Sequence, residues 1–298
     1  MAYGKGVTVL PGVHTVRPMS TVWPLQPEVL DVLAGVWEGR RLIVFLTGAG
    51  VSAESGIPTF RGEEGYWTAG SVEYLPSELA TFESFRRDPR MLWSWYLYRL
   101  GVCRAAQPNA AHRALAELEA AVGDRFLLVT QNVDGLHLRA GNTLERTFQI
   151  HGTIEFMRCA AECSTRLWPL PEGVGPVAKD TLVDEDTFDL LRCPDCGEPT
   201  RPHVLWFDET YDEEHYHWDS AQAAMGHADV LVIVGSSGAT NLPIQMAGLA
   251  GAHGVPVIDV NVDQDDFTAL IRTPEVWIDL RQSAGQAVPA IVRSLTPG

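Results

Sequence analysis

The stretch that decides the fold runs from Thr47 to Arg61 and reads Thr-Gly-Ala-Gly-Val-Ser-Ala-Glu-Ser-Gly-Ile-Pro-Thr-Phe-Arg. It follows the short apolar run 42–46, Leu-Ile-Val-Phe-Leu, which predicts a buried strand. Gly48, Gly50 and Ala53 then stand at the spacing of a dinucleotide-binding fingerprint, whose small residues permit a tight turn and a close backbone approach to a pyrophosphate. The same spacing also fits an ordinary strand-to-helix turn, because glycines follow many strands for steric reasons alone.

The tail of this stretch departs from an ordinary Rossmann unit. Gly56 and Pro58 should end any helix that begins at Ser52 and leave an irregular loop above the phosphates. In addition, no clear second strand ends in Asp or Glu about 20 residues further on, where a dehydrogenase would grip the adenosine ribose. The sequence therefore predicts a nucleotide-binding fold that is used in an unusual way.

Alternating strands and helices follow along the rest of the chain. Apolar runs at 126–130, 230–234 and 255–260 predict further buried strands, and helical patterns at 27–38, 82–102 and 285–295 lie among them. We read residues 62–81, which show no sustained period, as a long loop with at most a turn of helix. Strands that alternate with helices predict an α/β fold with a doubly wound parallel sheet.

Polar residues follow several of these strands, at the end where open α/β sheets bind their ligands. Gln131, Asn132 and Asp134 follow one strand, and a Gly-Ser-Ser turn at 235–237 follows another. His151 closes the apolar strand 148–150 in a position exposed enough for a general base, although a structural imidazole is the alternative interpretation.

Four of the five cysteines form two pairs, Cys159 with Cys163 and Cys193 with Cys196, separated by an insert of 29 residues. The second pair, in Cys-Pro-Asp-Cys-Gly, has the spacing of a zinc knuckle. Four thiolates saturate a tetrahedral zinc ion and leave no position for a water molecule. We therefore predict a structural zinc site and expect Cys103 to pack in a helix.

The composition excludes some partners. The 298-residue chain has a net charge of −16 and a pI near 4.9, which argues against nucleic acid as a partner and leaves basic peptides acceptable. No apolar run approaches the length of a membrane span. Residues 1–26 lack the features of a signal or transit peptide, so we expect an N-terminal extension and a cytoplasmic protein.

Together these motifs resemble the sirtuin family of NAD-dependent protein deacylases, from about Leu42 to Asp263. The resemblance rests on the segments 48–61, 130–137, 151–152, 206–207, 235–237 and 261 and on the two cysteine pairs, which come in the family's order. It implies a Rossmann-like NAD-binding domain formed by 27–61, 107–155 and 201–298. It also implies a smaller domain formed by a cofactor loop and helical module at 62–106 and a zinc module at 156–200.

The resemblance also implies roles for individual residues. In the family's reaction the acyl-lysine carbonyl oxygen displaces nicotinamide from NAD, and His151 would be the base that helps a ribose hydroxyl attack the resulting imidate. The products would be free lysine and O-acyl-ADP-ribose. The implied NAD-binding residues are Gly48, Ala49, Gly50, Ser52, Thr59, Phe60, Arg61, Gln131, Asn132, Asp134, Gly235, Ser236, Ser237, Asn261 and Val262. The implied acyl-lysine substrate residues are Ala80, Tyr96, Arg99, Val133, Val204, Trp206 and Phe207.

A subclass of the family is indicated by the motif Tyr96-Leu97-Tyr98-Arg99. Sirtuins that remove succinyl, malonyl and glutaryl groups carry Tyr-x-x-Arg on a helix of the small domain, and a guanidinium with a phenol suits a carboxylate-tipped acyl group. Ala80, Thr59 and the segment 65–67 are similar to this class as well. We favour acidic acyl groups over acetyl, and the two do not exclude each other.

Two questions stay open at this point. An ADP-ribosyltransferase or NAD glycohydrolase with the same cofactor is the alternative function, and the oligomeric state, monomer included, is undetermined. The sequence also departs from the family at Asp208, where a Gly is usual, in the segment expected to pair with the substrate backbone. We expect this side chain to alter peptide affinity or sequence preference.

Overall fold

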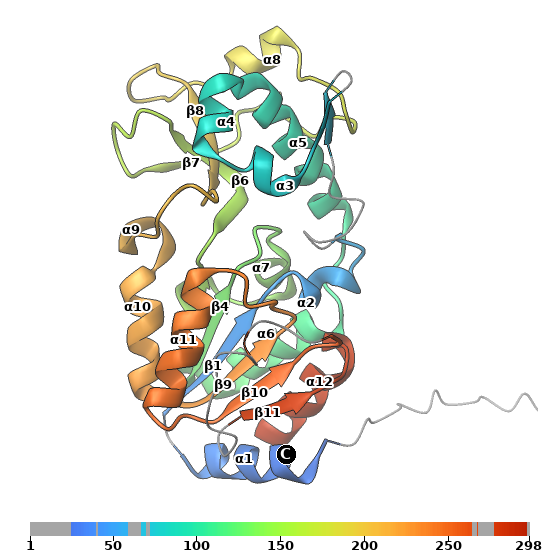
Figure 1. The fold of residues 1–298 in the computed structure, drawn as a ribbon, viewed down its shortest axis with the longest axis vertical. Helices are drawn as coiled ribbons and strands as arrows, with labels where there is room; N and C mark the ends of the chain where they lie inside the picture. Colours follow the sequence, from blue (N-terminus) through green and yellow to red (C-terminus); the bar gives the residue numbers. More distant parts are fainter. Residues whose placement is uncertain are drawn as a thin grey trace, which may run out of the picture.

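The computed structural model describes residues 25–39, 41–58, 67–69, 72–263, 267 and 277–296. These residues form a larger part built on a parallel sheet and a smaller part above it (Figure 1). Within these ranges, no helix combines the length and the apolar character needed to cross a membrane.

The larger part contains a six-stranded sheet in the order β11-β10-β9-β1-β4-β5, and every neighbouring pair is parallel. The strands β1, β4 and β9 are buried along nearly their whole length, because helices cover both faces of the sheet. The predicted doubly wound parallel sheet is thus confirmed. The strands are β1 (Leu42–Thr47), β4 (Phe126–Thr130), β5 (Thr147–Gln149), β9 (Ala228–Val234), β10 (Val257–Val260) and β11 (Trp277–Leu280).

Helices from distant parts of the chain cover the two faces. One hydrophobic cluster joins one face of the sheet to α1 (Pro27–Glu38), α6 (Ala110–Val122) and α12 (Ala284–Leu295). Another joins the opposite face to α10 (Trp218–Ala223) and α11 (Asn241–Ala252). Helix α6 begins directly after Asn109, because the Asn109 side chain accepts a hydrogen bond of 2.9 Å from the Ala111 N–H.

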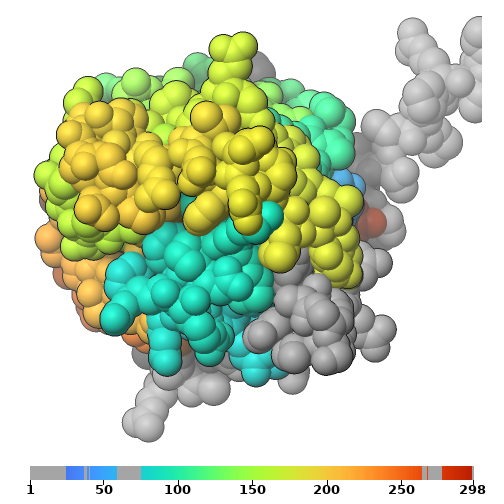
Figure 2. Space-filling view, turned by 90° about the horizontal axis from the view of Figure 1, so that it is seen from above, coloured from blue at the N-terminus to red at the C-terminus, as the bar shows by residue number. Residues whose placement is uncertain are grey.

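The smaller part combines an antiparallel sheet with helices. Its sheet has the order β7-β6-β8, made of Leu167–Pro169, Gly152–Cys159 and Thr200–Val204. The helices are α3 (Pro76–Leu79), α4 (Phe82–Arg87), α5 (Pro89–Ala105) and α8 (Glu185–Asp189). Seen from above, the helical module (teal) lies beside the insert of the zinc module (yellow), and one hydrophobic cluster joins them (Figure 2).

The expectation of a long loop at 62–81 is wrong for 67–69 and 72–74, which are strands, whereas the single turn of helix is present as α3. Strands β2 (Trp67–Ala69) and β3 (Val72–Tyr74) pair as an antiparallel hairpin, and α3 follows. These elements are too short for a hydrophobic period to reveal them.

The helical stretch predicted at 82–102 consists of two helices, α4 and α5. Asp88 caps α5 by accepting a hydrogen bond of 2.9 Å from the Met91 N–H, and Pro89 begins the new helix. The remaining short elements are α2 (Gly50–Ala53), α7 (Leu136–Ala140), α9 (Glu213–Tyr216) and the 3-10 turns Gly123–Arg125, Leu144–Arg146 and Ala224–His227.

Candidate active site

The order of the strands places a ligand crevice at the carboxyl end of β1. From β1 the chain continues to β4 and β5 on one side, and later to β9, β10 and β11 on the other. Where neighbouring strands are followed by segments that turn in opposite directions, a crevice opens between these segments. The carboxyl end of β1 is a topological switch point of this kind. The residues that follow β1, β4, β9 and β10 are the four predicted nucleotide-binding segments, so the structure brings them to one edge of the sheet.

The glycines of the opening loop are required by another part of the chain. A Cβ on Gly48 would lie 2.7 Å from the Gly235 carbonyl oxygen, and a Cβ on Gly50 would lie 2.7 Å from the Gly235 Cα. The Gly50 N–H already donates to the Gly235 oxygen at 2.8 Å. These glycines therefore allow a close backbone approach to the turn after β9, and the approach to a pyrophosphate stays a prediction.

A polar cluster lies under this loop. Helix α2 ends after four residues, as Gly56 and Pro58 predict, and its Ser52 hydroxyl donates to the Asp134 carboxylate at 2.7 Å. Asn132 donates to the Ser52 hydroxyl and to the Gly48 carbonyl, at 3.1 Å each. Burial raises the pKa of Asp134, against the effect of hydrogen bonds from the Leu136 N–H and from Ser52.

The turns after β9 and β10 are linked to the same cluster. The Gln131 side chain donates to the Ser236 hydroxyl at 2.7 Å, and Asn261 donates to the Ser236 carbonyl at 2.9 Å. Ser237 is half-buried in the same turn, Ala49 is half-buried in the first loop, and Val262 is 66% exposed beside Asn261. The predicted cofactor residues Thr59, Phe60 and Arg61 lie outside the described part of the chain.

His151 stands between β5 and β6, and Gly152 fixes its position. Gly152 has a φ of +78°, and a Cβ there would lie 2.2 Å from the His203 carbonyl oxygen, so only glycine fits. The His151 Nδ1 lies 3.0 Å from the Gln131 carbonyl oxygen, and its Nε2 lies 2.8 Å from the Tyr211 hydroxyl. Burial lowers the pKa of His151 to about 4, so the imidazole is neutral at pH 7 and able to accept a proton.

The predicted acyl-lysine residues also come together. Ala80, Tyr96, Val133, Val204 and Trp206 are buried in one hydrophobic cluster of the smaller part. The Trp206 indole N–H donates to the Tyr96 hydroxyl at 2.9 Å, and the Phe207 N–H donates to the Ala80 carbonyl at 2.9 Å.

Arg99 lies one helical turn after Tyr96 on α5. Its guanidinium carbon is 5.3 Å from the centroid of the Trp95 ring. Burial raises the pKa of both Tyr96 and Asp134, and the positive charge of Arg99 opposes the rise in each. The charge of Arg99 therefore acts both on a residue of its own helix and on a residue of the polar cluster under the opening loop. Phe207, which is 59% exposed, lies at the open side.

The loop after β8 is held by contacts that no sequence motif indicated. The buried Arg201 pairs with Glu209, and its guanidinium carbon lies 3.4 Å from the centroid of the Trp206 ring. Glu209 also accepts 2.9 Å from the Trp206 N–H. The Asp208 side chain contacts α4, because its carboxylate accepts hydrogen bonds from the first two N–H groups of that helix.

The four cysteines fit the predicted zinc site. Their sulfur atoms all lie within 4.8 Å of one another, with 3.6 Å between Cys159 and Cys196 and between Cys163 and Cys193. Four Zn–S bonds of about 2.3 Å in a tetrahedron require sulfur separations of a little under 4 Å, close to these values. The fifth cysteine, Cys103, is buried in α5 as expected.

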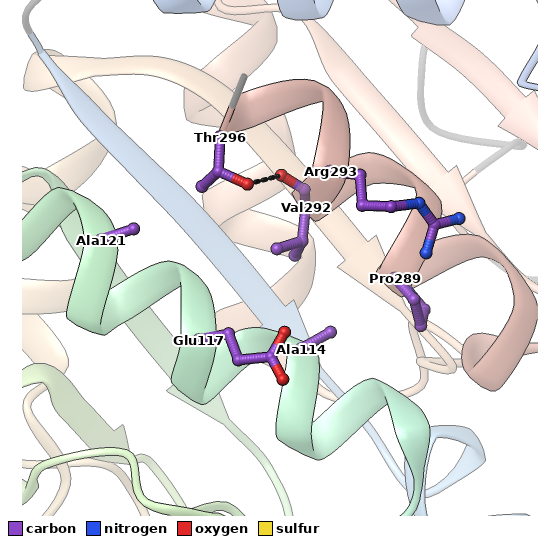
Figure 3. A pocket seen from close by; sticks show the side chains of 7 residues that line it. All are labelled: Ala114, Glu117, Ala121, Pro289, Val292, Arg293 and Thr296. Carbon is purple, nitrogen blue, oxygen red and sulfur yellow. Dashed lines mark hydrogen bonds between the residues drawn. The ribbon is translucent and has the colours of Figure 1, made fainter. Parts of the chain in front are cut away.

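A pocket lies between α6 and α12 (Figure 3). Its lining includes one carboxylate and one guanidinium but no residue predicted to bind NAD, substrate or zinc. The lining residues are Ala114, Glu117, Ala121, Pro289, Val292, Arg293 and Thr296.

Comparisons with known proteins agree with this geometry. The model of the Sir2 family matches residues 48–241. An NAD-dependent protein deacylase from Thermus thermophilus is 40% identical over 236 residues, covering 78% of this chain and 84% of the relative. NAD-dependent protein deacylase 1 from Pseudomonas aeruginosa is 39% identical over 271 residues, covering 91% and 99%. The solved structure of a Sir2 homologue bound to NAD superposes with a TM-score of 0.72 at 34% identity, covering 89% of this chain and 93% of that one.

These comparisons all indicate the same family, through the match to its model, the identity to the relatives and the shared fold. Three features of the structure agree with them: the order of the strands, the polar cluster at the switch point and the four-cysteine site. This chain belongs to the Sir2 family.

Proposed function

We propose that this Sir2-family chain is an NAD-dependent protein-lysine deacylase that removes succinyl, malonyl and glutaryl groups and accepts acetyl as a smaller group. The deacylase class is the one that its relatives' names give. The observation that supports the acyl preference is the position of Arg99 on α5 one helical turn after Tyr96, whose hydroxyl accepts a hydrogen bond from the buried Trp206 indole.

The cluster at the switch point is suited to NAD. The hydrogen-bonded side chains of Ser52, Asn132 and Asp134 offer a carboxylate and an amide to a nicotinamide carboxamide and its ribose. Gly235, Ser236 and Asn261 would hold the adenosine half. When bound, NAD supplies a ribose carbon that the acyl carbonyl oxygen attacks as nicotinamide leaves.

His151 would act as the general base. Its Nδ1 faces the carbonyl oxygen of Gln131, which can only accept, so Nδ1 carries the hydrogen and Nε2 holds the lone pair. Because burial lowers its pKa to about 4, this lone pair is unprotonated at pH 7. Nε2 would accept the proton of the ribose hydroxyl as that oxygen attacks the acyl carbon.

The acidic acyl group would find two matched partners. The Tyr96 oxygen accepts from the Trp206 indole, which directs the phenolic hydrogen towards another acceptor. Arg99 can bind a carboxylate through two parallel N–H groups, and such charge-assisted bonds are about twice as strong as neutral ones. An acetyl group reaches neither partner and would rely on the apolar wall of Ala80, Val133 and Trp206.

The test compares succinyl-, malonyl-, glutaryl- and acetyl-lysine peptides with wild type and Arg99→Met. We expect the variant to lose at least tenfold in kcat/KM for the acidic acyl groups, about the worth of one charge-assisted bond, and to keep its rate for acetyl within about threefold. Arg104→Met is the matched control, because it removes another guanidinium from the same helix, one that pairs with Glu155 at 2.6 Å. Equal losses for all four peptides would contradict the assignment.

Analysis of the products separates the alternative function. Peptide-dependent release of nicotinamide together with O-acyl-ADP-ribose supports the deacylase. Transfer of ADP-ribose to protein, or free ADP-ribose without an acyl product, would instead indicate an ADP-ribosyltransferase or NAD glycohydrolase. His151→Asn should abolish acyl product, and unchanged activity would refute the assigned base.

A further inference from the structure

A tyrosine that no motif indicated contacts the proposed base. Tyr211 lies in the loop between β8 and α9, just before Asp212, which caps α9 by accepting 2.6 Å from the His215 N–H. The Tyr211 hydroxyl lies 2.8 Å from Nε2 of His151, although 60 residues separate the two in the sequence.

The direction of this hydrogen bond follows from the other side of the ring. The His151 Nδ1 hydrogen is committed to the Gln131 carbonyl oxygen, so Nε2 has a lone pair and no hydrogen. The phenol must then be the donor. Burial raises the pKa of Tyr211 to about 12, which keeps the phenol protonated and able to donate at any pH where the protein works.

The rest of Tyr211 is held firmly. Its ring stacks on Trp218 with centroids 5.1 Å apart. The Thr240 side chain and the Leu242 N–H, at the start of α11, oppose the rise in the pKa of Tyr211. Thr240 itself donates to the Gln131 side chain at 3.1 Å. The hydroxyl therefore belongs to a network that surrounds the imidazole.

We propose that Tyr211 is a positioning residue that holds His151 in the Nδ1–H tautomer and occupies its Nε2 lone pair until a ribose hydroxyl of the substrate takes the same place. The inference rests on the proposed role of His151 in the reaction. A phenol and a sugar hydroxyl are donors of the same kind, and one lone pair accepts only one of them in a linear hydrogen bond. Engagement of the ribose therefore exchanges one hydrogen bond for another and breaks the contact with Tyr211.

This exchange predicts a gain of affinity when the phenolic hydroxyl is removed. Tyr211→Phe frees the lone pair without changing the ring that stacks on Trp218. Since a hydrogen bond within a protein has a modest net value, we expect ADP-ribose to bind about 2- to 10-fold more tightly to the variant in isothermal titration calorimetry. A residue with a merely structural role would weaken binding or leave it unchanged.

The free enzyme provides a second readout that needs no ligand. The Tyr211 hydrogen bond favours the neutral imidazole, so Tyr211→Phe should raise the pKa of His151 by about half a unit to one unit. NMR of protein with labelled histidines measures this pKa, and His151→Asn assigns the resonance. Tyr216→Phe is the matched control, because Tyr216 is also buried and its hydroxyl has no hydrogen-bond partner among the described residues.

The outcomes separate this inference from the proposed function. A raised pKa with tighter ADP-ribose binding, absent from Tyr216→Phe, supports the inference. An unchanged pKa overturns it, whether or not the enzyme removes acyl groups. A raised pKa with unchanged or weaker affinity overturns the exchange with the ribose. Failure of the proposed function would appear elsewhere, as wild-type protein that gives no acyl product from any of the four peptides.

Discussion

Asp208 offers a prediction that can be worked out from its contacts. Its carboxylate accepts hydrogen bonds of 2.7 Å from the Phe82 N–H and 3.1 Å from the Glu83 N–H, the first two groups of α4. Thr81 satisfies the third, by accepting 3.0 Å from the Ser84 N–H. Asp208 thus caps a helix that lies more than 120 residues earlier in the chain.

The substitution Asp208→Ala removes both acceptors and the negative charge. Loss of a helix cap costs about 1 kcal/mol, and loss of a carboxylate at a helix N-terminus costs about 0.5 kcal/mol. We therefore expect the free energy of unfolding to fall by about 1 to 1.5 kcal/mol, and the midpoint of thermal unfolding by about 2 to 5 °C for a chain of this size. Asp208→Asn keeps an acceptor oxygen and should lose about half as much.

Urea unfolding followed by circular dichroism measures the difference, with Glu145→Ala as a control. Glu145 is an exposed carboxylate for which the described residues show no ion pair. If Asp208→Ala stays within 0.3 kcal/mol of wild type, a margin typical of a neutral surface change, then Asp208 does not cap α4 in solution. A drop of equal size in Glu145→Ala would likewise remove the capping explanation.

Three further predictions concern the base, the metal and one glycine. Because burial lowers the pKa of His151 to about 4, its unprotonated form persists to lower pH than that of an ordinary histidine. We therefore expect kcat/KM for formation of the acyl product to stay level from pH 8 to about 5.5. A fall centred near pH 6.5 would contradict this. Cys196→Ser should lower bound zinc well below one ion per chain, as measured by atomic absorption, and should reduce thermal stability, whereas full zinc content would exclude Cys196 as a ligand. Gly152→Ala should lower the free energy of unfolding by at least about 2 kcal/mol in urea, since its Cβ would meet the His203 carbonyl. Gly135→Ala, in a left-handed conformation with a φ of +71° and open space around its Cβ, should lose only about 1 kcal/mol; equal losses would show that the contact is unimportant.

Much of the fold could be predicted because the patterns that indicate it lie in short, continuous segments of the sequence. The apolar runs that became β1, β4 and β9 are continuous, and the polar residues of each motif follow their strand directly. The zinc site could be predicted from the number of residues between the cysteines of each pair. Short elements carried less, and the hairpin of β2 and β3 was taken for loop because strands of three residues have no measurable period.

Contacts between distant segments were not readable in this way. The reason for glycine at positions 48 and 50 is the backbone of Gly235, which lies in another strand's turn. The Arg201–Glu209 pair under Trp206 is likewise set by how the loop after β8 folds back. Nothing in the residues beside Tyr211 indicates that its hydroxyl meets His151.

The sequence by itself indicated the family, the parallel sheet, the four cysteines expected to bind zinc and the polar residues at the carboxyl ends of the strands, since each depends on residue type and on spacing along the chain. Only the tertiary structure decided which of those residues touch and what holds them. It turned Asp208 from an isolated departure into a helix cap, and it placed a tyrosine on the lone pair of His151. Hydrogen bonds depend on atomic positions to within a few tenths of an ångström, and such positions are fixed by packing between segments that the order of residues does not bring together.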